Sequence, residues 1–399
     1  MASRRAARRF PDGFLALDYF GDADLVSLAA TGRVRALSLR RDCGLPRGVE
    51  ALARAALHLD WRGLVYSGGI ESRPALLRRL ERRGPLLGNG SAVVAAVRDP
   101  ARFFPFLRRA GIPHPPTFAG RGRPVPASGF PCLWKPIRSG GGARIRRALP
   151  GELRPRGFYR QVFLRGSPGS AAFVADGRRA ALLGVTRQLV GFRALGGEGF
   201  RYGGNIAGPS GRLLTRKARR VLADAVAGIT RRFGLRGLNG IDFVLSGGVP
   251  HILEINPRYT ASMELFEELS GSSLFDLHLE AVERGRLPGC PRAARRFLAK
   301  GILYATGRVV WPWSGVVAGI DARDRPMQGE RIERGHPVCT LVVSGGSPAE
   351  CRRRLEAAGA RVRRGLLDSV PEARRVTSVS RHGTRPSPAL RQGSRSVLR

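Results

Sequence analysis

The chain has 399 residues, which is too long for one ordinary hydrophobic core, so two or three packed units are expected. A composition of 43% hydrophobic and 25% charged residues excludes disorder along the whole chain. The formal net charge is +39, but the 69 basic residues are spread through every segment, and only 7% of residues are aromatic. A nucleic-acid groove concentrates charge and interleaves exposed aromatic residues, so we expect only non-specific adhesion to nucleic acid.

Neither membrane segments nor metal-binding cysteines are indicated. No run of about eighteen apolar residues occurs, and the opening MASRRAARRFPDG lacks the apolar region of a signal peptide, so a cytoplasmic protein without membrane contact is expected. The five cysteines lie far apart, which excludes a CxxC zinc site and a disulfide framework.

The first segment alternates between strand-like and helix-like patterns. Strands are predicted at 14–19, 35–39 and 63–69, and helices at 49–58 and 74–83. This alternation predicts a small parallel α/β unit over residues 1–95. Its opening strand is missing, since residues 3–9 already have the pattern of the helix that should follow one.

An α+β unit is predicted over residues 96–300. It opens with a helix at 100–110, continues with strands near 130–145, 158–164, 171–176 and 180–190, and includes a long helix at 213–233.

A smaller β-rich unit is predicted over residues 301–365. Its expected strands are ILYA, RVVW, VVAGID and HPVCTLVVSG, and a helix at 348–358 closes it. Residues 366–399 are rich in Arg, Ser, Pro and Gly and are predicted to be a disordered basic tail.

The segment 239–258, NGIDFVLSGGVPHILEINPR, carries the clearest chemical signal. A hairpin about Gly248 pairs Asp242 with Glu254, and Asn256 follows on the same face by the period of two. Two opposed carboxylates repel one another unless a cation lies between them, and their hard oxygens suit Mg²⁺ with waters and substrate phosphates as further ligands. The alternative is an exposed hairpin whose acids pair with nearby arginines.

Lys135 ends an apolar strand, and Ser139, Gly140, Gly141 and Gly142 follow it closely. Backbone N–H groups of such a loop can surround phosphate oxygens while the ammonium neutralises their charge. A plain turn is the alternative interpretation of the glycines, and no Walker motif is present.

The order of these parts resembles that of the ATP-grasp superfamily. WKPIRSGGGARI resembles its nucleotide-binding strand and mobile glycine loop, RQVFLRGSPGS its adenine-side hinge, and GIDFVLSGGVPHILEINPR its D…ExN metal segment. RYTASMELFEELSG, YSGGIESRPALLRRL and FRYGGNIAGP are similar to segments of a group described as predicted ATP-dependent carboligases. The resemblance implies a Rossmann-like N-terminal subdomain, a central subdomain and a C-terminal grasp subdomain, with ATP between two antiparallel sheets.

The resemblance also implies an activity, namely ATP- and Mg²⁺-dependent joining of a small-molecule carboxylate to an amine through an acylphosphate. It places Mg²⁺ at Asp242, Glu254 and Asn256, polyphosphate at Lys135 and the loop Ser139–Gly142, and adenine between Gln161 and Phe163. Arg258 and Lys135 are then the catalytic candidates. The phosphate-binding lysine that many members have near residues 98–102 is absent, and Arg98 or Arg102 is the candidate substitute.

Further expectations follow from the same resemblance. Arg201, Tyr202 and Asn205 are candidates for a substrate-side loop, with plain turn residues as the alternative. Relatives in the group favour amino-acid ligation in the biosynthesis of one-carbon cofactors, and a homodimer is left open. Two other functions also remain open: an ATP-dependent carboxylase or phosphotransferase that uses the same cleft, and a basic nucleic-acid-binding protein with a vestigial ATP site.

Overall fold

The computed structural model describes residues 13–32, 34–38, 48–120, 124–126, 129–289, 294–312 and 314–368. Helices and parallel strands alternate at its beginning, and a large antiparallel sheet follows, which confirms the predicted α/β and α+β class. The helix predicted at 3–9 lies outside the described residues. The disordered tail was predicted from residue 366, which is wrong for residues 366–368, because they end the last helix; the rest of the tail lies outside the described residues.

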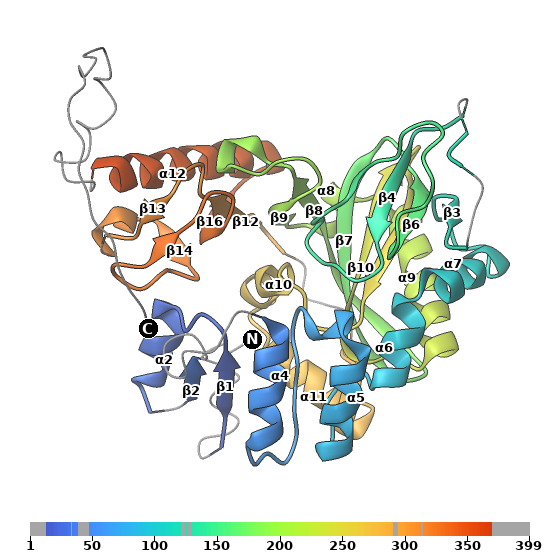
Figure 1. Ribbon diagram of the computed structural model, residues 1–399, viewed down its shortest axis with the longest axis horizontal. Coiled ribbons are helices and arrows are strands. Elements are labelled where there is room, and N and C mark those ends of the chain that lie inside the picture. The colour runs from blue at the N-terminus through green and yellow to red at the C-terminus, as the bar shows by residue number, and fades with distance from the viewer. Residues whose placement is uncertain are drawn as a thin grey trace, which may run out of the picture.

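In the N-terminal part, short helices pack around a parallel pair of strands (Figure 1). Its elements are β1 (Leu15–Asp18), α2 (Ala23–Ala29), β2 (Arg35–Ser38), α4 (Val49–His58), η1 (Ile70–Ser72), α5 (Pro74–Arg83) and α6 (Ser91–Arg98). Helices α4 and α5 have the predicted bounds. The strand predicted at 63–69 is wrong, because this stretch forms a single bridge, from Leu64 to Leu86, and then turns at Gly69, with φ 103°, into η1.

Two larger antiparallel sheets hold most of the strands beyond the N-terminal part. The smaller sheet has the order β3-β6-β4-β5, with β3 (Thr117–Phe118), β4 (Cys132–Pro136), β5 (Arg146–Arg147) and β6 (Phe158–Val162). The larger sheet has the order β11-β10-β7-β8-β9-β12-β16-β14. Its strands are β7 (Ser167–Asp176), β8 (Ala180–Val190), β9 (Tyr202–Ala207), β10 (Arg236–Ser246), β11 (Val249–Asn256), β12 (Phe297–Tyr304), β14 (Asp321–Arg323) and β16 (Pro337–Gly345).

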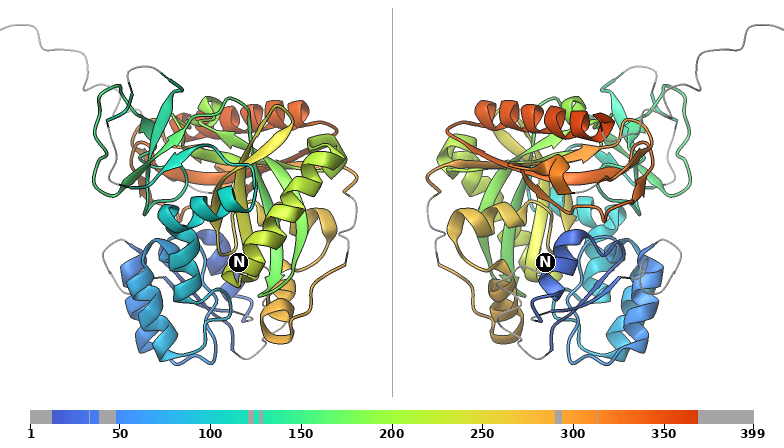
Figure 2. Two further views of the ribbon diagram at one scale, coloured as in Figure 1. Left: turned by 90° about the vertical axis from the view of Figure 1, so that its right-hand side faces the viewer. Right: turned by 90° about the vertical axis from the view of Figure 1, so that its left-hand side faces the viewer.

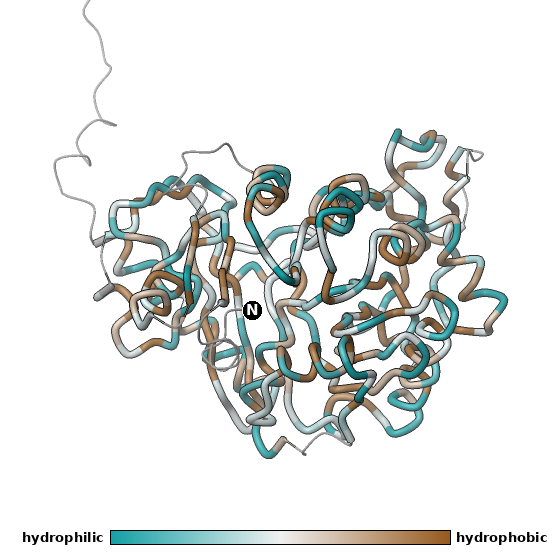
Figure 3. The backbone as a smooth tube through the Cα atoms, turned by 90° about the horizontal axis from the view of Figure 1, so that it is seen from below, coloured by the Kyte–Doolittle hydropathy of each residue, from teal (hydrophilic) through white to brown (hydrophobic). Residues whose placement is uncertain are grey.

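Helices cover both faces of the larger sheet (Figures 1 and 2). On one face lie α7 (Pro100–Arg109) and α9 (Arg216–Phe233), whose apolar stripe includes Leu222 and Ile229 and packs on Phe173 of β7. On the other face lie α10 (Met263–Ser270) and α11 (Leu274–Arg284), packed against the alternate side chains of the same strands. Figure 3 shows hydrophilic and hydrophobic residues mixed along the helices, as expected for elements with one buried face.

The C-terminal segment continues the larger sheet through β12 and β16, beyond residue 300. The strand predicted at VVAGID, residues 316–321, is wrong except at its last residue, because the 3-10 helix η3 (Ser314–Val317) and a turn precede β14, which begins at Asp321. Helix α12 (Pro348–Asp368) runs ten residues past the predicted end at Ala358, because Val362 and Leu366 continue its buried stripe. Short connecting elements complete the chain: α8 (Ser210–Leu213), η2 (Arg193–Leu195), β13 (Val309–Val310) and β15 (Arg331–Ile332).

Candidate active site

The hairpin of β10 and β11 has the predicted register at the candidate metal residues. Asp242 lies opposite Glu254, and Asn256 donates from Nδ2 to Asp242 Oδ2 at 3.1 Å, so all three side chains share one face. The turn itself is the glycine pair Gly247–Gly248, with Ser246 paired to Val249. A β-bulge next to Asp242 offsets this turn and brings the two carboxylates opposite each other.

The two carboxyl groups titrate as a pair. Burial, and next the charge of Glu254, raise the pKa of Asp242 to about 8. Burial also acts to raise the pKa of Glu254, but the cations Lys135 and Arg98 lower it by a larger amount, so that the net shift of its pKa is downward. Asp242 is therefore the carboxyl that holds the proton when no cation is present, and it also accepts a 2.8 Å hydrogen bond from Gln188 Nε2.

The donor set fits a hard divalent cation. The site offers two carboxylates, of Asp242 and Glu254, and the amide of Asn256. This small set of oxygen donors suits Mg²⁺, which keeps several waters and binds substrate phosphates, better than zinc. A cation would also replace the proton that burial and repulsion place on Asp242.

Lys135 lies beside this pair, as predicted. The side chain emerges from β4 with 6% exposure and donates from Nζ to Gln161 Oε1 at 3.2 Å. Burial acts to lower the pKa of Lys135, but Tyr159, Glu254 and Asp242 together raise it by a larger amount, so that the net shift of its pKa is upward. The lysine is thus a buried ammonium within electrostatic reach of both carboxyl groups.

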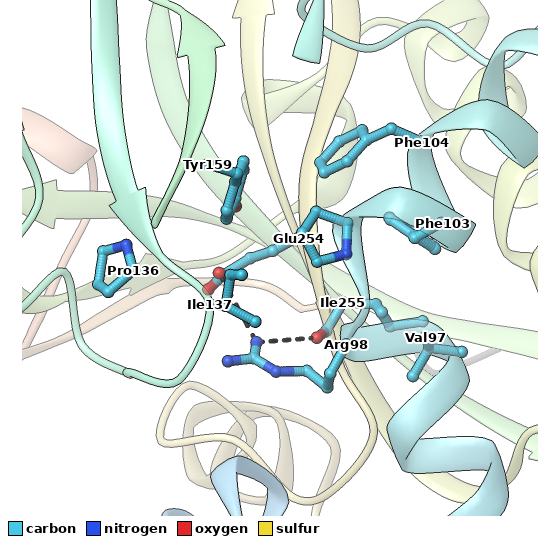
Figure 4. A pocket seen from close by; sticks show the side chains of 10 residues that line it. Val97, Arg98, Phe103, Phe104, Pro136, Ile137, Tyr159, Glu254 and Ile255 are labelled. Carbon is cyan, nitrogen blue, oxygen red and sulfur yellow. Dashed lines mark hydrogen bonds and ion pairs between the residues drawn. The ribbon is translucent and has the colours of Figure 1, made fainter. Parts of the chain in front are cut away.

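Of the two candidate substitutes for the missing lysine, Arg98 lies beside Glu254, whereas Arg102 is exposed on α7. Figure 4 shows Tyr159 and Arg98 on either side of the Glu254 carboxylate. The guanidinium of Arg98 lies 3.7 Å from Glu254 and donates to the carbonyl oxygens of Ile255 at 3.4 Å and Ser139 at 2.8 Å. It therefore connects the metal hairpin with the start of the glycine loop.

The glycine loop bends back over the larger sheet. Gly141 and Gly142 have φ of 63° and 73°, and the Gly141 carbonyl accepts from Tyr202 N at 2.9 Å. A Cβ on Gly142 would lie 1.8 Å from Phe200 O, so this position requires glycine. Ser139 donates its hydroxyl to Ala143 O at 3.0 Å, within the loop.

The two hinge candidates have different surroundings. Gln161 is buried in β6, where its amide donates to Thr117 Oγ1 at 3.0 Å and accepts from Lys135. Phe163 follows β6, lies edge-on to Phe200 at 6.3 Å between ring centroids and lies under the guanidinium of Arg147. Their contact with adenine stays a prediction.

Arg258 forms an ion pair that the sequence did not predict. Its Nε donates to Glu71 Oε1 at 2.7 Å, although 187 residues separate the two, and its Nη1 donates to Tyr259 O at 2.9 Å. Glu71 belongs to the segment YSGGIES, which was singled out only by its resemblance to a family. Gln188 was also missed, because its reach toward Asp242 depends on the order of strands in the sheet.

The substrate-loop candidates lie partly in a strand. Tyr202 and Asn205 belong to β9, which makes the interpretation as a loop or turn wrong for them. Asn205 is fully buried, with bonds to Thr186 and Tyr202, because β9 lies inside the sheet between β8 and β12. Arg201 lies just before the strand and donates to Gly335 O at 2.7 Å.

A family model and two known proteins match parts of this sequence. Residues 97–262 match the family described as ATP-grasp domain. The arginine-specific large chain of carbamoyl phosphate synthase from Geobacillus stearothermophilus is 24% identical over 226 residues, which cover 53% of this chain and 21% of that protein. An uncharacterized protein of Methanocaldococcus jannaschii is 24% identical over 223 residues, covering 53% and 50% of the two chains. The match thus spans half or less of these relatives' own lengths.

Solved structures share the fold over most of the chain. Biotin carboxylase from Campylobacter jejuni, in a complex with β,γ-ATP, superposes with a TM-score of 0.66 at 14% identity, covering 89% of this chain and 86% of that one. L-amino acid ligase from Bacillus licheniformis superposes with a TM-score of 0.61 at 14% identity, covering 88% and 98%. At such identities the likeness establishes the fold, which is the predicted ATP-grasp fold.

No helix among the described residues is long and apolar enough to cross a membrane.

Proposed function

Because residues 97–262 of this chain form an ATP-grasp domain, we propose that the protein is an ATP- and Mg²⁺-dependent ligase that joins a carboxylate to an amine. One observation carries this proposal: the buried Lys135 lies within electrostatic reach of the partly buried Asp242–Glu254 pair on the facing sheet. Unlike charges gathered at such burial are arranged for a highly charged ligand rather than for stability. The ATP-bound carboxylase and the amino acid ligase found among solved structures support the nucleotide and the reaction class.

The proposed reaction has two steps. In the first, a carboxylate oxygen of the acid attacks the γ-phosphorus of ATP, ADP leaves, and an acylphosphate forms. In the second, the amine nitrogen attacks the acyl carbon, phosphate leaves, and the nitrogen loses its proton. Mg²⁺ held by Asp242, Glu254 and Asn256 would supply charge neutralisation at the β- and γ-phosphates.

The chain's own residues bind and orient in both steps. Lys135 donates to the polyphosphate, and Arg98 contributes a second cation beside it. The loop Ser139–Gly142 covers the phosphates and excludes water. Arg258 stabilises the negative charge that develops on the acylphosphate oxygen when the amine attacks.

The division of the chain into three domains is also part of this proposal. Residues 1–95 would contribute one wall of the substrate site, 96–300 the nucleotide site, and 301–365 the β-rich end of the sheet. Amino-acid ligation in the biosynthesis of a one-carbon cofactor is the favoured context, by analogy alone.

Nucleotide binding is the first test. Isothermal titration with MgATP should give binding to the wild type and at least ~10-fold weaker binding to the double variant Asp242→Ala, Glu254→Ala. The matched control replaces the exposed carboxylates Asp60 and Asp224, which removes the same number of carboxyl groups and should leave binding intact. Equal affinity in the wild type and the Asp242/Glu254 variant would refute the metal assignment.

Product analysis then separates the reaction classes. Candidate carboxylates are crossed with candidate amines and ADP release is measured, and a ligase should release ADP and form amide only when both are present. ADP release with bicarbonate in place of the acid would support the second candidate, a carboxylase, which the likeness to biotin carboxylases favours.

A further inference from the structure

The ion pair between Glu71 and Arg258 joins the N-terminal part to the candidate active site. Glu71 lies in η1 with 3% exposure, and Arg258 follows β11 two residues after the candidate metal ligand Asn256. The guanidinium is held at two nitrogens, by Glu71 Oε1 at Nε and by Tyr259 O at Nη1. Its other terminal nitrogen makes no hydrogen bond among the described residues, which leaves donors for a ligand.

The burial of Glu71 in this ion pair carries an energetic cost for the fold. The second oxygen of Glu71 is enclosed and has no hydrogen-bond partner in the described part of the chain. Burying a carboxylate with one oxygen unsatisfied costs free energy that the ion pair only partly offsets. An arrangement that does not maximise stability points to a role in orientation.

The backbone of the same turn is fixed from the same side. Pro257 O accepts from Asn89 Nδ2 at 3.0 Å, and Tyr66 donates its hydroxyl to Asn89 O at 2.6 Å. Asn89 also donates to Asn239 Oδ1 at 2.8 Å, so one buried amide connects the turn with β10. The N-terminal part thus holds both the main chain at residue 257 and the side chain at residue 258.

Glycine backbone packs against one side of the guanidinium. A Cβ on Gly68 would lie 3.6 Å from Arg258 Cζ, so the main chain of the 68–69 turn packs directly beside the side chain. Gly69, with φ 103°, makes the turn that delivers Glu71. The guanidinium therefore has a carboxylate, a carbonyl and a glycine turn around it, and its rotamer is fixed before any substrate binds.

We infer that Glu71 is a positioning residue, which holds the Arg258 guanidinium in the orientation that stabilises the acylphosphate. The inference rests on the proposed function of Arg258. A fixed guanidinium stabilises developing charge without reorganising, whereas an arginine free to sample its rotamers loses part of that effect. The N-terminal part is then a component of the active site, because it supplies the residue that orients Arg258.

Steady-state kinetics of Glu71→Gln tests the inference. The substitution keeps the side-chain volume and removes the charge, so kcat should fall ~10-fold or more while the KM for ATP stays within ~2-fold. In the Arg258→Ala background the same substitution should change kcat by less than ~2-fold, because the group that it positions is gone. Glu71→Asp, which retains the charge, should recover part of the loss.

A matched control separates orientation from folding. Glu81 on α5 accepts from Ser91 N and Oγ in the same N-terminal part and does not touch Arg258. Glu81→Gln should lower the melting temperature and leave kcat within ~2-fold of the wild type. An unchanged kcat in Glu71→Gln, or losses that multiply in the double variant, would overturn the inference.

The failure of the ligase proposal would give a different result. If no pair of acid and amine supports turnover, the coupling is measured by thermal unfolding of the wild type, Glu71→Gln, Arg258→Ala and the double variant. Melting-temperature shifts that fall short of additive show that the pair is coupled in solution. Additive shifts overturn the positioning of Arg258 by Glu71 independently of any substrate.

Discussion

Replacing Asp242 by Asn should stabilise the metal-free protein at neutral and alkaline pH. In the folded state Asp242 is partly buried opposite Glu254, and its pKa is raised from an ordinary 3.8 to about 8, first by loss of solvation and then by the charge of Glu254. Asn has nearly the same shape as the protonated Asp and is uncharged at every pH, although it can accept only one of the two amide hydrogen bonds that Asp242 accepts from Gln188 and Asn256. The variant is therefore a permanent analogue of the protonated site.

The direction of the effect follows from proton linkage. A folded state that binds the proton more tightly than the unfolded chain is stabilised below the unfolded pKa, and this stability is lost as pH rises through the folded value. Between pH 4 and pH 7 the shift corresponds to at most ~4 kcal/mol at about 1.4 kcal/mol per pKa unit. Water penetration and sharing of the proton with Glu254 reduce this, and we expect roughly 1–2 kcal/mol, or about 2–5 °C in melting temperature.

Thermal unfolding with EDTA and with Mg²⁺ is the assay. At pH 8 with EDTA, Asp242→Asn should melt above the wild type, and near pH 4.5 the difference should be small. Mg²⁺ should raise the melting temperature of the wild type at pH 8 and leave the variant unchanged. Asp224→Asn, which neutralises an exposed carboxylate on α9, is the control and should show neither effect. Equal pH profiles for the wild type and Asp242→Asn would refute the buried-pair reasoning.

Three further substitutions have expected outcomes. Lys135→Met should weaken MgATP binding by ~10-fold or more in a calorimetric titration, since a buried ammonium is lost beside the phosphates. Gly142→Ala should raise the KM for ATP or lower kcat, because its Cβ would lie 1.8 Å from Phe200 O, whereas Gly140→Ala, which meets nothing within 4 Å, should be mild. Leu222→Ala empties a fully buried position in α9 and should cost about 2–4 kcal/mol in denaturant unfolding.

The metal hairpin could be predicted because its geometry is local. Two strands joined by a short glycine turn have few possible registers, and the period of two then places Asn256 on the face of Glu254. The sequence pattern specifies neither the turn at Gly247–Gly248 nor the β-bulge beside Asp242. The one-residue shift of the turn is compensated by the bulge, so Asp242 pairs with Glu254 as predicted. Lys135 was likewise predictable, since a strand and the glycine loop after it are adjacent in sequence.

The rest of the site depends on contacts between distant segments. The pairing of Glu71 with Arg258 requires the N-terminal part to be placed against β11, and no local pattern in either segment specifies that. Gln188 lies on β8 and reaches Asp242 on β10 across the one strand between them, β7, and this contact depends on the strand order of the sheet. Helix α12 was predicted too short, since Gly359 and Gly365 resemble ends although both lie within the helix.

The three lysines also indicate which basic positions have a specific chemical role. Lys217 is exposed on α9, but Lys135 and Lys300 are buried, with 6% and 5% exposure, each beside acidic groups. A guanidinium is planar and needs room for five donors, whereas an ammonium is compact and can occupy a narrow buried space. In a chain that otherwise uses arginine, a buried lysine therefore identifies a space that only an ammonium fits. Lys300 satisfies its charge with Glu264 and Ala261 O, whereas Lys135 donates to the amide oxygen of Gln161 and forms no ion pair within 4 Å in the described part of the chain, so Lys135 is the one with donors left for a phosphate.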